Sequence, residues 1–401
     1  MIRTWALAFL LASALAVGVQ AAEIKRVAFL PFTPEVSTDA WLGYLLADVC
    51  EKALATNTYA DVPRSAERRD AVKSLGTSIT GAVARDPMSV AKALGLDYVA
   101  VGWVSRADDQ LALDLELRSV TTGERVLAQS FRAPMDDPLD AGLYAASHVS
   151  EAIFGAPLLS YATQVVRPVK VSRHALEPYG LGLAALDRAL GAKAEGDGRH
   201  CAMYLIEASN RLAEAVTAQP ELLWPYDPLL EASQRIIDID PTVPGAYVNI
   251  AVARKALGDI GGAVNVLRNG RSAVAGSGLV RVALANVLLD LAAQSPMDRP
   301  QALREAVQAA TEGTSLEPAL PEAWAVKGAA AFDSGDYEAA ATAYLKAADL
   351  RPLDPVSELG AGLSLARLGR WEEARGHLEQ VTQLDHGAYA QRAARELEKM
   401  G

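Results

Sequence analysis

The chain has 401 residues, of which 51% are hydrophobic and 22% are charged, and this composition is typical of a folded globular protein. Its formal net charge of −11 argues against general nucleic-acid binding, because phosphate neutralisation requires clustered Lys and Arg. The same acidic balance disfavours attraction to anionic membrane surfaces. A chain of this length can hold two or three domains, each with its own core.

Residues 1–22 are predicted to be an export signal. The segment MIRTWALAFLLASALAVGVQAAE has a basic Arg3, a long apolar run and then small residues. We expect cleavage after Ala21 or Ala22, which would leave the mature protein in the periplasm or outside the cell. The apolar run is shorter than the roughly 20 residues that span a bilayer, so a retained membrane anchor is the less favoured alternative. No membrane span is expected after cleavage.

The next segment, residues 24–155, is predicted to form an α/β domain. RVAFLPF is a short apolar run that predicts a buried strand. STDAWLGYLLADVCEKALA follows with a Ser37 or Thr38 cap and an apolar stripe, which predict a helix. A short strand near residues 59–62 and two polar helices come next. RSAERRD, in the first of these helices, is expected to be a solvated face.

Three consecutive strands are predicted in LDYVAVGWVSRADDQLALDLELRSVTTGERVLAQSFRAP. Turn signals at Asp108 and Gly123 separate them, and LALDLELRS alternates apolar with polar residues. A final helix is expected over about residues 139–154. This order of elements predicts a mixed sheet with helices packed on it.

Three segments of this domain carry a family resemblance. RVAFLPF, AKALGLDYVAVGWVSR and LRSVTTGERVLAQSF resemble the amino-terminal α/β domain of TolB-like and FlgO-like bacterial proteins. Ser119 and Val120 stand where that family often has an acidic residue, so the last segment matches less well. The resemblance implies a domain for envelope assembly and interaction, and it implies no catalytic residues.

A linker is predicted at residues 156–173, where Pro168 disfavours one continuous helix. Irregular repeat-like helices are expected over residues 174–243. GLGLAA, at the start of this region, superficially fits a dinucleotide fingerprint but does not follow a predicted strand. Its glycines instead predict close helix packing.

Residues 244–386 repeat with a period of about 34 residues, in which small residues recur where helices would touch and bulky residues recur between them. One unit shows the pattern in Trp324, Gly328, Ala340 and Tyr344, and GRWEEA in the next unit echoes its GDYEAA. AAQSPMDRP is interpreted as an enlarged turn inside the second unit. The predicted unit starts are Pro244, Gly278, Pro321 and Pro355.

These repeats resemble the tetratricopeptide repeat (TPR) family, and the last helix, residues 387–401, is expected to be a polar cap. In that family the first helices of successive repeats line a concave groove that binds a partner. The resemblance therefore implies a partner-binding groove whose mixed charge and single aromatic residue suit an extended peptide. For each residue the alternative is an ordinary solvated side chain. The implied groove residues are Lys255, Phe332, Asp333 and Arg367.

The sequence offers little catalytic chemistry. The five histidines are scattered without metal-ligand spacing, and neither a nucleophile elbow nor a phosphate-binding loop is present. No cofactor or metal is therefore expected. Cys50 and Cys201 could form a disulfide in an exported protein, although the apolar helical pattern around Cys50 favours a buried free thiol.

These observations predict an α+β protein, with a small mixed-sheet α/β domain followed by an all-α solenoid of tetratricopeptide type. The function they favour is a non-catalytic, exported scaffold of the bacterial cell envelope that holds one or more envelope proteins. The alternatives are a small-ligand sensor that uses the α/β domain and, less favoured, an enzyme.

Overall fold

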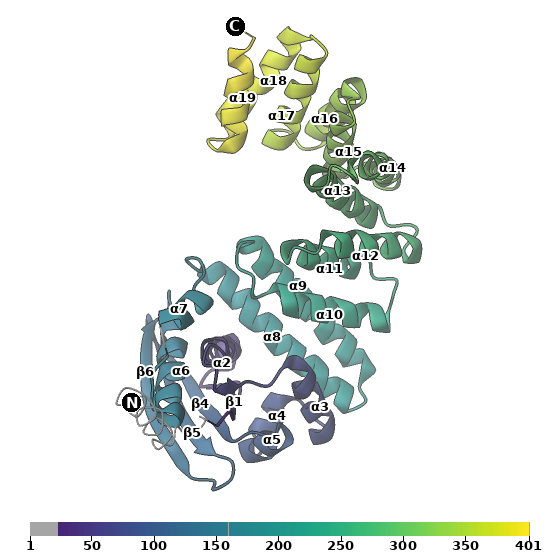
Figure 1. The fold of residues 1–401 in the computed structure, drawn as a ribbon. Coiled ribbons are helices and arrows are strands. Elements are labelled where there is room, and N and C mark those ends of the chain that lie inside the picture. The colour runs from purple at the N-terminus through teal and green to yellow at the C-terminus, as the bar shows by residue number, and fades with distance from the viewer. Residues whose placement is uncertain (1–22, 159, 401) are drawn as a thin grey trace, which may run out of the picture. The chain divides into compact units, whose positions relative to one another are not determined.

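The computed structural model describes residues 23–158 and 160–400, so the predicted export signal lies outside the described residues. The chain divides into two compact units, Met1–Pro225 and Tyr226–Gly401. The first unit contains a mixed sheet with helices, and the second is helical throughout its described part (Figure 1). This arrangement confirms the predicted fold class.

The sheet of the first unit has the strand order β3-β1-β4-β5-β6. β1 pairs in parallel with both β3 and β4, whereas β4, β5 and β6 form an antiparallel meander. The short β2 lies beside β4, also in parallel. The strands are β1 (Lys25–Phe29), β2 (Thr33–Pro34), β3 (Ala60–Asp61), β4 (Tyr98–Ala107), β5 (Gln110–Ser119) and β6 (Arg125–Pro134).

Helices cover both faces of this sheet. On β5 the leucines alternate with polar residues and are buried on the face against which α6 packs. On the opposite face, Ala28 and Val99 pack against residues of α3, α4 and α5. The helices are η1 (Ser37–Asp39), α2 (Ala40–Leu54), α3 (Ser65–Leu75), α4 (Ile79–Val83), α5 (Pro87–Ala93) and α6 (Leu139–Phe154).

The first unit continues through the segment predicted to be a linker and includes a pair of long helices. α7 (Ser160–Val166) buries two apolar side chains, and α8 (Arg173–Ala194) packs along α2 and against α9 (Gly198–Ala218). The compact unit therefore ends at Pro225 and not near residue 156. The physical reason is that α8 is tied to the α/β layer by close backbone packing and by buried polar contacts.

Two residues of α8 make these ties. Gly180 lies so close to α2 that a Cβ at this position would be 2.4 Å from the Trp41 carbonyl oxygen. Asp187 is buried, and its carboxylate accepts hydrogen bonds from the Tyr44 hydroxyl at 2.8 Å and from the Ile79 amide at 2.8 Å. The glycine-rich segment is thus a helix-packing surface, as predicted.

The second unit is a run of ten helices over its described residues, arranged as successive pairs with a leading and a closing helix (Figure 1). The helices are α10 (Tyr226–Ile239), α11 (Pro244–Ala256), α12 (Ile260–Ala273), α13 (Gly278–Gln294), α14 (Arg299–Leu316), α15 (Pro321–Asp333), α16 (Tyr337–Leu350), α17 (Pro355–Arg367), α18 (Trp371–Leu384) and α19 (Ala388–Glu398).

The second repeat corrects one detail of the sequence interpretation. Its extra residues lie mostly in longer helices and not in an enlarged turn. α13 has 17 residues and α14 has 18, whereas α11 has 13 and α12 has 14. The residues that follow the usual helix end, LAAQ, are good helix formers, so the helix continues through them.

A recurring turn explains why GDYEAA is echoed along the chain. Gly258 and Gly335 adopt positive φ angles of 87° and 85°, which glycine tolerates better than other residues. The next residue, Asp259 or Asp336, then caps the second helix by accepting a hydrogen bond from a first-turn amide. The same Gly-Asp turn joins α8 to α9.

We predict that Gly180→Ala destabilises the first unit. Alanine favours a helix by about 1 kcal/mol over glycine, but a methyl group here would overlap the Trp41 carbonyl, and overpacking typically costs about 1–3 kcal/mol. The melting temperature, followed by Trp fluorescence, should fall. The matched control is Gly198→Ala in α9, where an added Cβ has no neighbour within 4 Å. An equal rise in both variants would contradict the packing.

Candidate functional site

The first helices of the successive pairs form one continuous layer. α11 packs on α13, α13 on α15, α15 on α17, and α17 on α19. We call the exposed surface of α11, α13, α15, α17 and α19 the first-helix face. It displays apolar side chains to solvent, since Val252, Leu279 and Val356 are 38%, 44% and 41% exposed.

Side chains near the ends of these helices contact one another from repeat to repeat. The Lys255 Nζ lies 2.8 Å from the Asp290 Oδ2, which links α11 to α13. At the equivalent places two repeats later, the Arg367 guanidinium of α17 lies 5.8 Å from the ring centroid of Phe332 in α15. It lies equally far from the Tyr337 ring. The Lys255–Asp290 and Phe332–Arg367 contacts therefore join the same two repeat positions in neighbouring repeats.

The structure thus places the side chains of three of the four predicted groove residues in contacts between repeats. Asp333 is exposed, and its carbonyl oxygen accepts a hydrogen bond from the Arg299 guanidinium at 3.5 Å. Sequence reasoning missed Asp290, although the unit start at Gly278 puts it at the same place in the repeat as Asp333 and Arg367. Its partner could not be identified without the packing of α11 on α13.

Phe332 and Arg367 also line a hollow of about 480 Å³ at the carboxyl end of the array. The other lining residues come from α17 and from α19 with its C-cap. Lys255 and Asp333 are outside the lining, so the predicted residues do not form a single site. The full lining consists of Phe332, Leu363, Arg367, Arg392, Arg395, Glu396, Glu398 and Lys399.

Hydrogen bonds from side chains to the backbone hold the starts of the first helices α11 and α15. Early in α11 the Tyr247 hydroxyl donates a hydrogen bond to the Pro241 carbonyl at 2.9 Å. At the equivalent place in α15, the Trp324 indole donates to the Pro318 carbonyl at 2.8 Å. Each bond ties the start of a first helix to the loop that precedes it.

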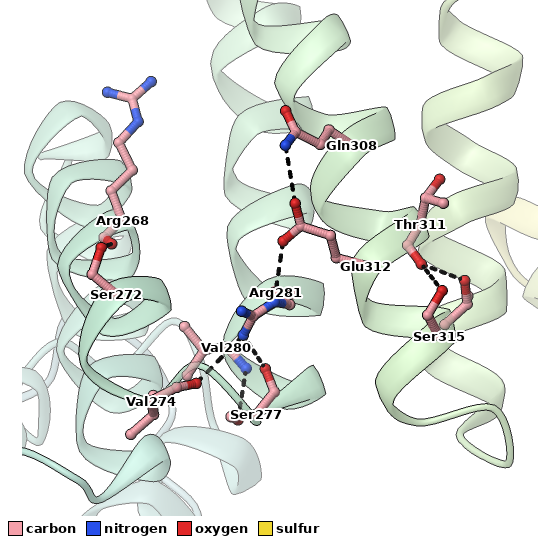
Figure 2. Close-up of polar contacts among 11 residues, drawn as sticks. Arg268, Ser272, Val274, Ser277, Val280, Arg281, Gln308, Thr311, Glu312 and Ser315 are labelled. Carbon is pink, nitrogen blue, oxygen red and sulfur yellow. Dashed lines mark hydrogen bonds and ion pairs between the residues drawn. The ribbon is translucent and has the colours of Figure 1, made fainter.

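At the equivalent place in α13, the side chain that bonds to the backbone is a buried arginine, Arg281 (Figure 2). Arg281 is 8% exposed and donates to the Ser277 carbonyl at 2.9 Å. Its Nε also donates to the Glu312 carboxylate of α14 at 3.1 Å, and Gln308 donates to the same carboxylate at 3.0 Å. The buried charge is therefore paired and hydrogen-bonded, as burial requires.

Other reactive groups of the described residues are dispersed. Residues 23–158 and 160–400 contain no group of three or more potential metal-ligating side chains. His377 Nδ1 lies 2.7 Å from the Glu358 carboxylate, and Cys50 and Cys201 are buried thiols that are not joined in a disulfide. Over the same residues, no helix is both long and apolar enough to cross a membrane.

A sequence match identifies one repeat. Residues 321–352, which comprise α15 and α16, match the tetratricopeptide repeat. Among curated proteins, no sequence match is found. The likeness of residues 24–155 to TolB-like and FlgO-like domains stays a prediction.

Solved structures of other helical-repeat proteins align with close to half of the chain. They include MamA from Desulfovibrio magneticus RS-1, the thermophilic TPR protein TTC0263 from Thermus thermophilus, and YrrB, a TPR protein with an unusual peptide-binding site. Their identities are 18%, 16% and 15%, with TM-scores of 0.36, 0.39 and 0.35. The alignments cover 46%, 47% and 47% of this chain and 94%, 98% and 99% of those chains.

We predict a pH-dependent contribution from the Arg268–Glu305 pair, which joins α12 to α14 at 3.0 Å and 2.6 Å. The hydrogen bond from Arg268 lowers the pKa of Glu305. A carboxylate with a lowered pKa stabilises the folded state above its unfolded pKa of about 4.3, and this effect disappears as pH falls through the folded value.

The difference in unfolding free energy between the wild type and Glu305→Gln should therefore be constant at neutral pH, at about 1 kcal/mol or less, and shrink below about pH 4.3. Urea denaturation at several pH values measures it. Glu379→Gln, which replaces an exposed carboxylate of α18, is the control. A difference that grows toward acidic pH would contradict the assignment.

Proposed function

We propose that this protein is a non-catalytic scaffold whose first-helix face holds a segment of a partner protein. The observation that carries the proposal is the continuous layer of first helices, which keeps apolar and charged side chains exposed over successive repeats. A single extended segment can contact several such helices at once, and apolar anchors with surrounding polar groups are typical of protein interfaces. The first helix of the identified tetratricopeptide repeat, α15, belongs to this layer.

The proposal includes export to the bacterial envelope. Its basis is the sequence of residues 1–22, with a basic start, an apolar run and small residues before the expected cleavage point. The partner would then be an envelope protein, and the α/β domain would provide a second docking surface. The mature chain would carry out its function without a cofactor.

Photo-cross-linking of the full chain in its native cells tests this function. A photo-reactive amino acid in place of Val252, Leu279 or Val356 should capture one partner repeatedly, because these exposed side chains share the first-helix face. The matched controls replace Thr342 or Lys346, which are exposed on the second helix α16. The cross-linked, processed chain should be recovered from the periplasmic or secreted fraction.

Equal capture from both sets of positions would contradict a specific first-helix face. Capture from neither set would contradict the scaffold and favour the alternative, a small-ligand sensor built on the α/β domain. Recovery of an unprocessed chain from the cytoplasm would contradict export while leaving the binding surface intact.

A further inference from the structure

The hollow at the carboxyl end of the array combines an apolar floor with a cationic rim. Phe332 and Leu363 are its apolar lining residues, and Leu363 is 8% exposed. Two lining carboxylates, Glu396 and Glu398, are outnumbered by cations in a protein whose net charge is −11. The lining cations are Arg367, Arg392, Arg395 and Lys399.

The closing helix α19 is held so that its cations surround this hollow. Ala393 is fully buried, and Leu397 packs with it against apolar residues of α17 and α18. Arg392, Arg395 and Lys399 are three and four residues apart, so they share one side of the helix. The helix expected to be only a polar cap therefore contributes one wall of the hollow.

Several of these cations lack the carboxylate partners that other arginines of the array have. Arg268 and Arg281 are both ion-paired. By contrast, in the ion pairs of the described residues neither Arg367 nor Arg392 takes part, whereas Lys399 pairs with Glu396. Arg395 Nε donates to the Gln391 carbonyl at 3.2 Å. Their remaining N–H groups can therefore receive carboxylates from another molecule.

We propose that this hollow binds an acidic segment of the partner protein, with an apolar side chain of that segment on its floor. Guanidinium groups bind carboxylates through paired, charge-assisted hydrogen bonds, so an acidic segment complements the rim. The contact of Arg367 with the rings of Phe332 and Tyr337 fixes one of these groups before binding. This inference rests on the proposed function and names the chemistry of the partner.

Selection of peptides from a random library displayed on phage, against the full mature chain, tests the proposal. The enriched peptides should carry Asp or Glu on either side of an aromatic or aliphatic residue. Arg392→Glu/Arg395→Glu should remove this preference and weaken the strongest peptide by about tenfold or more, which corresponds to 1.4 kcal/mol. Circular dichroism and thermal melting check that each variant folds.

The matched control is Arg304→Glu/Arg375→Glu, which makes the same change in charge at exposed positions outside the hollow. It should keep the acidic preference and an affinity within about twofold, well below the tenfold effect that 1.4 kcal/mol produces. Enrichment of neutral or basic peptides, no enrichment, or an equal loss in both variants would overturn the proposal. If cross-linking at Val252 and Leu279 still captures a partner, the proposed function stands and only the acidic hollow fails.

Discussion

Helix packing in the repeat array depends on bulky side chains that lie directly against glycines of neighbouring helices. The Tyr344 ring of α16 is the clearest case, because a Cβ on Gly328 of α15 would be 2.7 Å from it. A Cβ on Gly360 of α17 would be 2.4 Å from the same ring. One ring therefore sets the approach of two successive first helices. Because such close packing leaves no free space, a change in side-chain volume here would shift the neighbouring helices. The packing therefore fixes the spacing of the helices that form the first-helix face.

The contacts on the first-helix face follow from this frame. Because α15 and α17 are held close together, Arg367 can reach across to Phe332. The closing helix α19 then packs on α17 and α18 and adds its cations to those of the last repeat. A helix whose structural task is to cover apolar residues can in this way also supply recognition groups. The first unit uses the same principle, since Gly180 brings α8 against the backbone of α2.

The sequence predicts well those features that arise from local patterns. Alternating leucines predict β5, and Gly-Asp turns together with small residues in register predict the helix pairs of residues 244–386. It cannot assign α8 to the first unit, because Asp187 meets Ile79 and Tyr44 across separations of 108 and 143 residues. Arg68, expected on a solvated face, instead pairs with the partly buried Glu51. The predicted groove residues Lys255 and Phe332 were identified by register, but their partners depend on packing between repeats.

Hydrogen–deuterium exchange of the full mature chain, with and without its selected peptide or captured partner, tests whether the partner binds on the first-helix face. Binding should slow exchange in α15, α17 and α19, because these helices present the proposed recognition groups. Exchange in the second helices α16 and α18 should change less. Protection confined to the second helices, or to the sheet of the first unit, would contradict binding on the first-helix face.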